Sequence, residues 1–228
     1  VYNDARAIER SVDKAMTSVL LHKAGVATPP AWAVEHADEA RRILVREASG
    51  GHALVLKPMF GSQGKGLMRV GQVDGEWVPL PDLASVGGLA YLQRFVPPPA
   101  TANTDGAGFD WRVLVIGGRA VAAMQRVSRH WIHNIAQGAR SVPCVLTPAL
   151  AGLAEAAARA LEMDYAGVDL VPDASSRAGA QVIEVNGVAA WRGLQRVTGF
   201  DIAEAIVDDL IARRLGHAED VMAQVCQI

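Results

Sequence analysis

The first residues with recognisable chemistry are a lysine and a glycine-rich loop. Lys57 ends the otherwise apolar segment 53–56, and Gly61-Ser62-Gln63-Gly64-Lys65-Gly66 follows shortly afterwards. Glycines let a backbone close over an oxyanion, and a lysine that interrupts a buried run needs an anionic partner, so the two predict a phosphate site. The spacing is not that of a Walker A loop, because Leu67 follows Gly66. The alternative interpretation is a structural hairpin tip beside a surface lysine.

Acidic side chains interrupt two apolar segments later in the chain. Asp169 lies within the segment 166–171, and Glu184 lies within the segment 182–186, which ends at Asn186. Glu184 and Asn186 are two residues apart, so in a strand they share one face. Carboxylate and amide oxygens suit Mg²⁺, which takes its other ligands from phosphates and water. We predict a magnesium site here; a buried, hydrogen-bonded group of strand-end side chains is the alternative.

A third polar group consists of Asp110 and Arg112, which again are two residues apart. An aspartate suits a ribose hydroxyl, and the arginine fork suits a phosphate or an acyl phosphate. The two-residue turn at 117–118 predicts a hairpin in which Gln125, rather than Arg126, faces this pair. Arg126 could still reach the site from the strand end, and the sequence leaves that choice open. Taken alone, Asp110 and Arg112 are better interpreted as a surface ion pair.

These groups require strands and helices that bring them together. Ser11 as N-cap, apolar residues at helical spacing and Gly25 as a stop predict the first helix. Thr147, which precedes a proline, and Asp201 predict the starts of two later helices. Apolar segments predict strands over 53–57, 67–70, 91–96, 111–116, 119–126, 166–171 and 181–185. The resulting fold class is α+β.

The chain divides at a segment rich in proline and glycine. We predict a first lobe over residues 1–96, a hinge over 97–108 and a second lobe over 109–228. Each lobe is expected to be a mostly antiparallel sheet with helices. The lysine and the glycine loop then belong to the first lobe and the acidic residues to the second, so the site would lie in the cleft between them.

Composition excludes several classes of protein. The 228 residues carry 22 Lys+Arg and 24 Asp+Glu, a net charge of −2, and 50% are hydrophobic. This excludes a disordered chain and gives no basic footprint for nucleic acid or an anionic membrane. Cys144 and Cys226 lie far apart, which indicates a reduced, cytoplasmic protein, and no segment is long and apolar enough to span a membrane. We expect neither nucleic acid nor membrane as a partner, and a homo-oligomer stays open.

The order of these groups resembles the ATP-grasp superfamily and, within it, the RimK-type α-L-glutamate ligases. The resemblance extends from Arg10 to about Leu215. It rests on Asp13-Lys14, Val55-Leu56-Lys57 with the glycine loop, Asp110-Trp111-Arg112, Ala166-Gly167-Val168-Asp169, Ile183-Glu184-Val185-Asn186 and the segment 195–203. It implies the ATP-grasp fold, in which two lobes clasp ATP between them.

For the nucleotide, the resemblance implies a role for each matching position. Lys14 and Lys57 match the lysines that hold the ATP phosphates, and Asp110 matches the ribose ligand. Asn134 matches an asparagine near the phosphates and the metal. The flap above the phosphates matches Gly61, Ser62, Gln63, Gly64 and Gly66. The strand whose backbone reads adenine matches Gln93, Arg94, Phe95 and Val96.

For catalysis, the resemblance implies charge neutralisation by cations. Arg112, Arg126 and Lys57 match groups near the transferred phosphate. Asp169, Glu184 and Asn186 match the ligands of one or two Mg²⁺ ions, for which Mn²⁺ could substitute. In such enzymes a carboxylate takes the γ-phosphoryl group of ATP, and an amine then attacks the acyl phosphate.

The chain departs from the family pattern in three ways. Arg94 stands where the family usually has an acidic residue. The segment 186–193, Asn-Gly-Val-Ala-Ala-Trp-Arg-Gly, replaces the usual N-x-S-P-G and looks more like relatives that glutamylate a cofactor. The family normally has a further domain before the helix with Asp13-Lys14, and this sequence is expected to lack it.

We therefore predict an ATP- and Mg-dependent ligase that joins an amino acid, most plausibly L-glutamate, to the carboxylate of a cofactor, peptide or protein. The alternative is an ATP-binding sensor or scaffold without turnover. Two weaker interpretations concern single residues. His130 and His133 could bind a metal if they were helical, and Trp131 and Trp191 could line an acceptor pocket.

Overall fold

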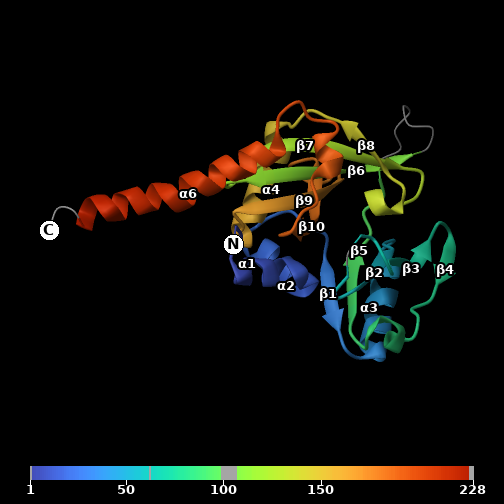
Figure 1. Ribbon diagram of the computed structural model, residues 1–228. Coiled ribbons are helices and arrows are strands. Elements are labelled where there is room, and N and C mark those ends of the chain that lie inside the picture. The colour runs from blue at the N-terminus through green and yellow to red at the C-terminus, as the bar shows by residue number, and fades with distance from the viewer. Residues whose placement is uncertain (1, 62, 99–106, 226–228) are drawn as a thin grey trace.

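Two five-stranded antiparallel sheets form the framework of the molecule (Figure 1). The computed structural model describes residues 2–61, 63–98 and 107–225. The first sheet has the strand order β1-β5-β2-β3-β4, with bounds β1 Ala31–Val34, β2 Leu54–Pro58, β3 Met68–Val73, β4 Glu76–Val78 and β5 Ala90–Arg94. The second has the order β10-β9-β6-β7-β8, with bounds β6 Gly108–Ile116, β7 Arg119–Ser128, β8 Arg140–Pro143, β9 Tyr165–Pro172 and β10 Ala180–Asn186. The predicted α+β class is confirmed.

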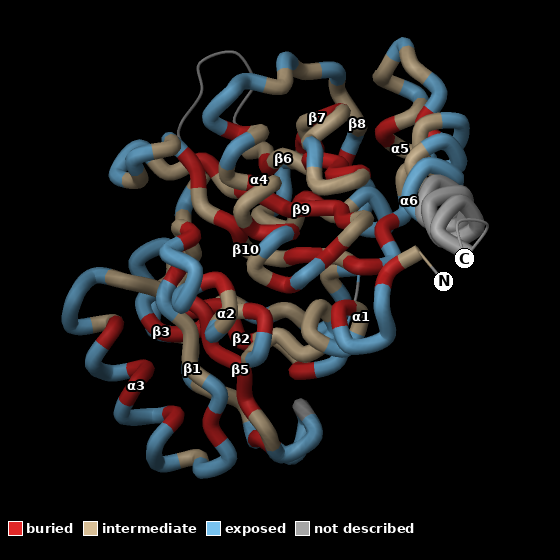
Figure 2. The backbone as a smooth tube through the Cα atoms, turned by 90° about the vertical axis from the view of Figure 1, so that its left-hand side faces the viewer, coloured by how far each residue is buried: buried red, intermediate tan, exposed pale blue. Residues whose placement is uncertain are grey.

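Helices pack on the faces of the sheets through buried apolar side chains. Ile43 and Leu44 of α3 pack on Leu54 and Leu92 of the first sheet. The helix α4 packs on the second sheet in the same way. Buried residues accordingly concentrate along β2, β5 and β9 (Figure 2). The helices are α1 Ala5–Val12, α2 Lys14–Lys23, α3 Ala37–Ser49, α4 Pro148–Ala160, α5 Arg192–Gln195 and α6 Ile202–Val225, with short 3-10 turns η1 Leu83–Val86 and η2 Ile135–Gln137.

Two helices begin where the capping pattern predicts. Thr147 accepts a hydrogen bond from the backbone N–H of Leu150 at 3.3 Å, and Pro148 is the first residue of α4. Asp201 accepts from the backbone N–H of Ala203 at 2.8 Å at the start of α6. A side-chain oxygen at the N-cap satisfies an N–H that the helix itself leaves unpaired, which is why these residue types fix the boundary.

The first helix differs from its prediction. Ser11 is not an N-cap, because the chain forms two helices that meet at Asp13. Asp13 ends α1 and caps α2 by accepting from the backbone N–H of Met16 at 2.9 Å. Thr17 donates to the carbonyl of Arg10 at 2.6 Å across this elbow. The break makes Lys14 the first residue of α2.

The helices α1 and α2 pack on the core of the second sheet. Ala7, Leu21 and Val26 belong to the same buried cluster as Val113 and Val168 of the second sheet. The division at 97–108 assigned this segment to the first lobe, and residues 99–106 of that hinge lie outside the described residues. The chain therefore starts on the second sheet's core before it enters the first sheet at β1.

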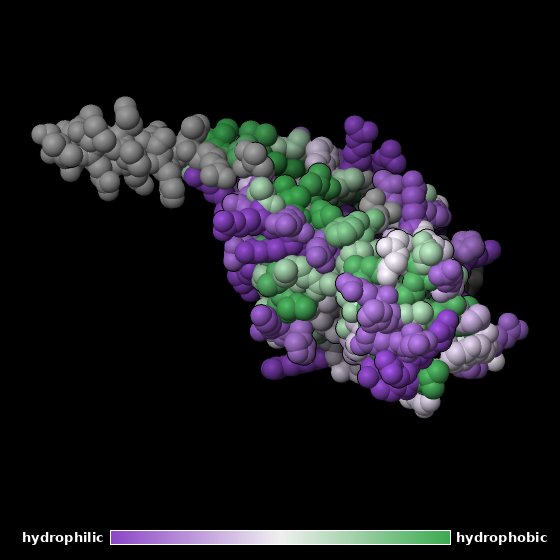
Figure 3. Space-filling view, turned by 90° about the horizontal axis from the view of Figure 1, so that it is seen from below, coloured by the Kyte–Doolittle hydropathy of each residue, from purple (hydrophilic) through white to green (hydrophobic). Residues whose placement is uncertain are grey.

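Polar side chains surround small apolar patches on the face seen from below (Figure 3). The exposed apolar residues include Val12, Met16 and Val19 of α1 and α2, which are 51%, 46% and 49% exposed. Within the described ranges, none of the helices combines the length and the apolar character needed to cross a membrane.

Candidate active site

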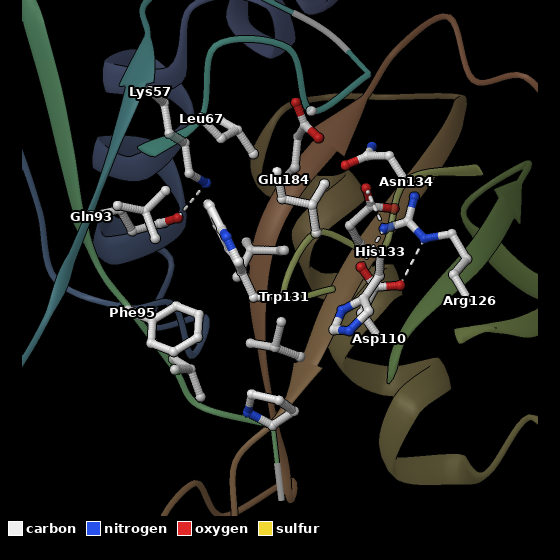
Figure 4. Close-up of a pocket in the computed structure, with 18 of the residues that line it drawn as sticks. Lys57, Leu67, Gln93, Phe95, Asp110, Arg126, Trp131, His133, Asn134 and Glu184 are labelled. Atoms are coloured by element: carbon white, nitrogen blue, oxygen red, sulfur yellow. Dashed lines mark hydrogen bonds and ion pairs between the residues drawn. The ribbon is translucent and has the colours of Figure 1, made fainter. Parts of the chain in front are cut away.

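A cavity lies between the two sheets, and side chains from both of them line it (Figure 4). Lys57, Gln93 and Phe95 approach it from the first sheet and its end. The predicted site residues that line it are Lys14, Lys57, Gly61, Gly64, Gln93, Arg94, Phe95, Val96, Asp110, Arg126, Asn134, Asp169 and Glu184. The predicted residues Gln63, Gly66, Arg112 and Asn186 are not among those lining it, and Ser62 lies outside the described residues.

The two lysines enter the cavity from different elements. Lys57, near the end of β2, donates from Nζ to Oε1 of Gln93 at 2.6 Å. Lys14, at the start of α2, donates from Nζ to the carbonyls of Met59 at 3.2 Å and Gly61 at 2.9 Å. Neither ammonium group forms an ion pair with a described residue, so both positive charges are available to an anionic ligand.

The pKa of Lys57 makes anion binding dependent on pH. Burial lowers this pKa from 10.5 to about 8, although Glu184 opposes the shift. Phosphate binding favours the protonated amine. At a pH above this pKa the free protein has lost that proton, so Lys57 must take up a proton when the phosphate binds. We expect the affinity for an ATP analogue to fall as pH rises above about 8, approaching tenfold per pH unit. Calorimetric titrations between about pH 7 and pH 9.5 measure this, and Lys57→Arg should flatten the dependence because its guanidinium stays charged.

The glycine loop reaches across the cavity to the second sheet's side. A Cβ atom at Gly64 would lie 2.6 Å from Oδ1 of Asn134 and 2.8 Å from Cγ2 of Ile132, and the φ of Gly64 is +71°. Gln137 donates from its amide to the carbonyl of Gln63 at 3.2 Å. The loop before η2 and the glycine loop therefore meet, and only glycine fits at position 64.

An aromatic and cationic group closes one end of the cavity. The rings of Phe95 and Trp131 meet edge to face with centroids 6.0 Å apart, and the guanidinium of Arg69 lies 5.2 Å and 5.6 Å from them. Trp131 lines the same cavity as Lys57. Arg69 was not predicted, because a single arginine in a strand carries no sequence signal. These contacts join β3 to the loop that follows β7.

Arg94 lines the cavity, but its charge is already paired elsewhere. Its Nε and Nη2 donate to Oε2 of Glu47 on α3 at 3.0 Å and 2.6 Å. Side chains alternate along β5, so Gln93 faces Lys57 while Arg94 faces α3. Burial alone would raise the pKa of Glu47, but Arg94 and Arg46 hold it below its ordinary value. Arg94, where the resemblance leads one to expect an acidic residue, therefore adds no unpaired cation to the cavity.

A β-bulge decides which residue faces Asp110. The hairpin turn pairs Val115 with Ala120, but Leu114 pairs with Ala122, so Val121 is an extra residue in β7. The predicted partner Gln125 is wrong, because the bulge moves the register by one residue. Arg126 stands directly opposite Asp110 and points toward it (Figure 4).

Two arginines and two aspartates form a buried cluster beside the cavity. Arg126 donates to both oxygens of Asp110 at 2.7 Å and 2.6 Å and lies 3.0 Å from Asp169. Arg112 binds both oxygens of Asp169. Asp110, Arg126 and Asp169 are each at most 3% exposed. The surface ion pair that the sequence favoured for Asp110 and Arg112 is therefore wrong.

The cluster contains two positive and two negative side chains, and the pKa values of its two aspartates shift in opposite directions. Burial raises the pKa of Asp110 to about 6, although Arg126 opposes the shift. Burial would also raise the pKa of Asp169, but Arg112 and Arg126 together hold it below its ordinary value. Asp169 is thus the more firmly ionised of the two acids.

The three predicted metal ligands lie on neighbouring strands. Glu184 is directly opposite Asp169 in the β9–β10 pair, next to a bulge at Ile183. Glu184 makes no hydrogen bond or ion pair with any residue in the described ranges, whereas Asp169 is held by the two arginines. Asn186 donates from Nδ2 to the carbonyl of Gly167 at 3.3 Å. Two carboxylates and one amide side by side suit a magnesium ion, with Glu184 as the unengaged carboxylate.

The histidines do not form the helical metal pair. Residues 129–134 are not helical, and no cluster of three or more His, Cys, Asp or Glu suited to a metal occurs among the described residues. His133 instead lines the cavity, and burial together with Arg126 lowers its pKa to about 4, so its ring is neutral. Trp191 packs beside Leu194 and Ile202 rather than lining the cavity.

Sequence comparison finds similar ligases over most of the chain. A family model described as the RimK-like ATP-grasp domain matches residues 11–210. The chain is 33% identical over 213 residues to the tetrahydromethanopterin:alpha-L-glutamate ligase of Methanococcus maripaludis, covering 92% of this chain and 69% of that one. It is 29% identical over 218 residues to a probable alpha-L-glutamate ligase of Parasynechococcus marenigrum, covering 95% and 44%.

Solved structures of the same fold are also similar. The ATP-grasp ligase PsnB, complexed with minimal precursor, Mg and ADP, matches with a TM-score of 0.68 and 21% identity, covering 93% of this chain and 61% of that one. The D-alanine–D-alanine ligase of Bacillus anthracis matches with a TM-score of 0.64 and 14% identity, covering 96% and 72%. The ATP-grasp fold expected from the sequence is confirmed.

Proposed function

The chain belongs to the RimK-like ATP-grasp family of ATP-dependent ligases, and we propose that it joins an amino acid to a carboxylate by forming an amide bond. The observation that carries the proposal is the cavity between the sheets. Two lysines without ion-pair partners among the described residues and the unengaged carboxylate of Glu184 face this one space. Cations and a hard-oxygen ligand in one cleft are what Mg-ATP requires.

Each residue has a distinct part in this proposal. Lys14 and Lys57 would bind the phosphates beneath the glycine loop, Asp110 would bind the ribose, and Phe95 and Trp131 would enclose the base. Glu184, Asn186 and Asp169 would hold one or two Mg²⁺ ions, or Mn²⁺ in their place, which supply charge neutralisation. Arg126 and Arg112 would stabilise charge near the transferred phosphate through the buried cluster.

The proposed reaction has two steps. An oxygen of the acceptor carboxylate attacks the γ-phosphorus of ATP, and ADP leaves. The amine nitrogen then attacks the acyl phosphate carbonyl, phosphate leaves and the nitrogen loses its proton. No covalent enzyme intermediate is needed, so the protein contributes binding, orientation and electrostatics.

We propose L-glutamate as the amino acid and a small cofactor bearing a carboxylate as the acceptor. The names of the relatives from Methanococcus maripaludis and Parasynechococcus marenigrum, both alpha-L-glutamate ligases, support glutamate. The segment 186–193 supports a cofactor over a protein terminus. The two cysteines, of which Cys144 is a free thiol, are consistent with a reduced, cytoplasmic setting.

The test is a turnover assay. The protein is incubated with Mg-ATP, L-glutamate and a panel of pterin, peptide and other carboxylate acceptors, while ADP and phosphate are measured and the products are weighed by mass spectrometry. ADP formation that depends on both glutamate and one acceptor, with one glutamyl mass added, is the expected result. Tight ATP binding without turnover on any acceptor would instead indicate the sensor or scaffold alternative.

A further inference from the structure

Asn3 is a buried side chain whose hydrogen bonds all go to backbone groups of the second lobe. It is 3% exposed, and its Nδ2 donates to the carbonyls of Tyr165 and Gly187, each at 2.7 Å. Its Oδ1 accepts from the N–H groups of Asp164 at 3.0 Å and Tyr165 at 2.9 Å. The amide is therefore fully engaged in connecting the chain start to β9 and to the turn after β10.

The same turn is held from a second direction by Ser11 at the end of α1. The N–H of Gly187 donates to Oγ of Ser11 at 3.3 Å, and Ser11 donates in turn to the carbonyl of Ile8 at 2.8 Å. A Cβ atom at Gly187 would lie 2.8 Å from Oγ of Ser11 and 2.9 Å from Cε of Met163. Both the N–H and the carbonyl of Gly187 are thus fixed by side chains that precede the first sheet.

This turn forms one wall of a second cavity that adjoins the main one. Gly187 and Val188 line it together with Phe60, and it shares Lys14, Gly61 and Glu184 with the main cavity. The shared residues are those proposed for the phosphates and the metal. Phe95 and Trp131, which are proposed to enclose the adenine base, line the main cavity but not the second one. Substrates other than the nucleotide would reach the transferred phosphate from this side.

We propose that Asn3, with Ser11, is a positioning residue that fixes the turn at Gly187 and so sets the acceptor side of the site. This proposal rests on the proposed function for its kinetic consequence, though not for the contact itself. The elbow between α1 and α2 extends the connection, because Ser11 binds the turn while Lys14, three residues later, binds the carbonyl of Gly61 at the start of the glycine loop. One short segment thereby connects the phosphate side to the acceptor side.

The discriminating variant is Asn3→Asp. The aspartate keeps a side-chain oxygen that can accept hydrogen bonds from the two N–H groups. It replaces the Nδ2 donor with an oxygen that faces two carbonyls. We expect the KM for the acceptor to rise about tenfold, the size of one lost hydrogen-bonding group, while the KM for ATP stays within about twofold. Ser11→Ala should shift the same constant in the same direction and covers the case in which Asn3→Asp does not fold.

The matched control is Tyr2→Phe in the same segment. Tyr2 donates to Asp209 and packs edge to face on Tyr165 with ring centroids 5.9 Å apart, but it has no hydrogen bond to Gly187. Loss of the Tyr2 hydroxyl should lower the melting temperature without changing the KM for the acceptor substrate. Equal kinetic changes in Tyr2→Phe and Asn3→Asp, or an equal rise in the KM for ATP, would overturn the positioning role.

Hydrogen–deuterium exchange separates this proposal from the proposed function. The Gly187 amide should exchange at least tenfold faster in Ser11→Ala and Asn3→Asp than in the wild type and Tyr2→Phe. Unchanged exchange at Gly187 in both variants would overturn the positioning role of Asn3 and Ser11 even if the enzyme turns over. A wild type without turnover would reject the proposed ligase function, and the exchange measurement would still test whether Asn3 and Ser11 fix the turn at Gly187.

Discussion

Replacing Glu184 with glutamine is expected to lower the rate of ADP formation by about a hundred- to thousandfold. Glutamine keeps the shape of the side chain but removes the one carboxylate at the metal position that no described residue engages. Asp169 cannot compensate, because Arg112 and Arg126 already hold its oxygens. The apparent affinity for Mg²⁺ should weaken, so raising the magnesium concentration should restore part of the rate.

The rate is measured as ADP formation at several magnesium concentrations, beside the affinity for ATP without metal. That metal-free affinity should change little, because the lysines and the aromatic end of the cavity are intact. Glu76→Gln, an exposed carboxylate in β4, is the matched control and should retain the wild-type rate. A Glu184→Gln enzyme with normal turnover and normal magnesium dependence would remove Glu184 from the metal site.

The fold and most of the cavity could be predicted from the sequence because local patterns determine them. Thr147 before Pro148 begins a helix through one side-chain oxygen, and short apolar runs such as 54–56 favour buried strands. Lys57 and Glu184 stand out because each places a charge in such a run. A charged residue at a buried strand position requires a partner, and that requirement is visible without any coordinates.

The errors arise where one residue shifts a register or where the partner lies far away in the chain. Position 125 was predicted to face Asp110, because a turn of two glycines gives that register, but the bulge at Val121 adds one residue and brings Arg126 opposite it. The pairing of Arg94 with Glu47, 47 residues away, has no local signal. The role of Asn3 has no local sequence signal either, because a single asparagine at position 3 looks like any other polar residue.

Arg126→Met is expected to lower the free energy of unfolding by about 3–5 kcal/mol. Arg126 is 3% exposed and is the only described ion-pair partner of Asp110, so its loss leaves that buried carboxylate unpaired. Asp169 keeps Arg112 and is less affected. Methionine fills much of the space, so the cost comes from the uncompensated charge rather than from a cavity.

The pH dependence of this loss identifies its cause. Burial already raises the pKa of Asp110 to about 6, and without Arg126 it must rise further. A carboxyl whose folded pKa exceeds its unfolded value binds more protons when folded, so its contribution to stability is present at low pH and lost as pH rises through the folded pKa. The deficit of Arg126→Met relative to the wild type should therefore shrink from pH 8 towards about pH 5.

Urea unfolding at several pH values measures the deficit, and a second substitution tests its origin. Adding Asp110→Asn to Arg126→Met removes the unpaired charge, so the double variant should be more stable than the single one at pH 8. Its deficit relative to the wild type should no longer shrink as pH falls towards about 5, because the double variant lacks the Asp110 carboxyl whose pKa is raised. Arg41→Met, which breaks the exposed pair with Asp38, should change stability by less than about 0.5 kcal/mol. A deficit in Arg126→Met that is independent of pH and unrelieved by Asp110→Asn would mean that lost packing, not the buried carboxylate of Asp110, is the cause.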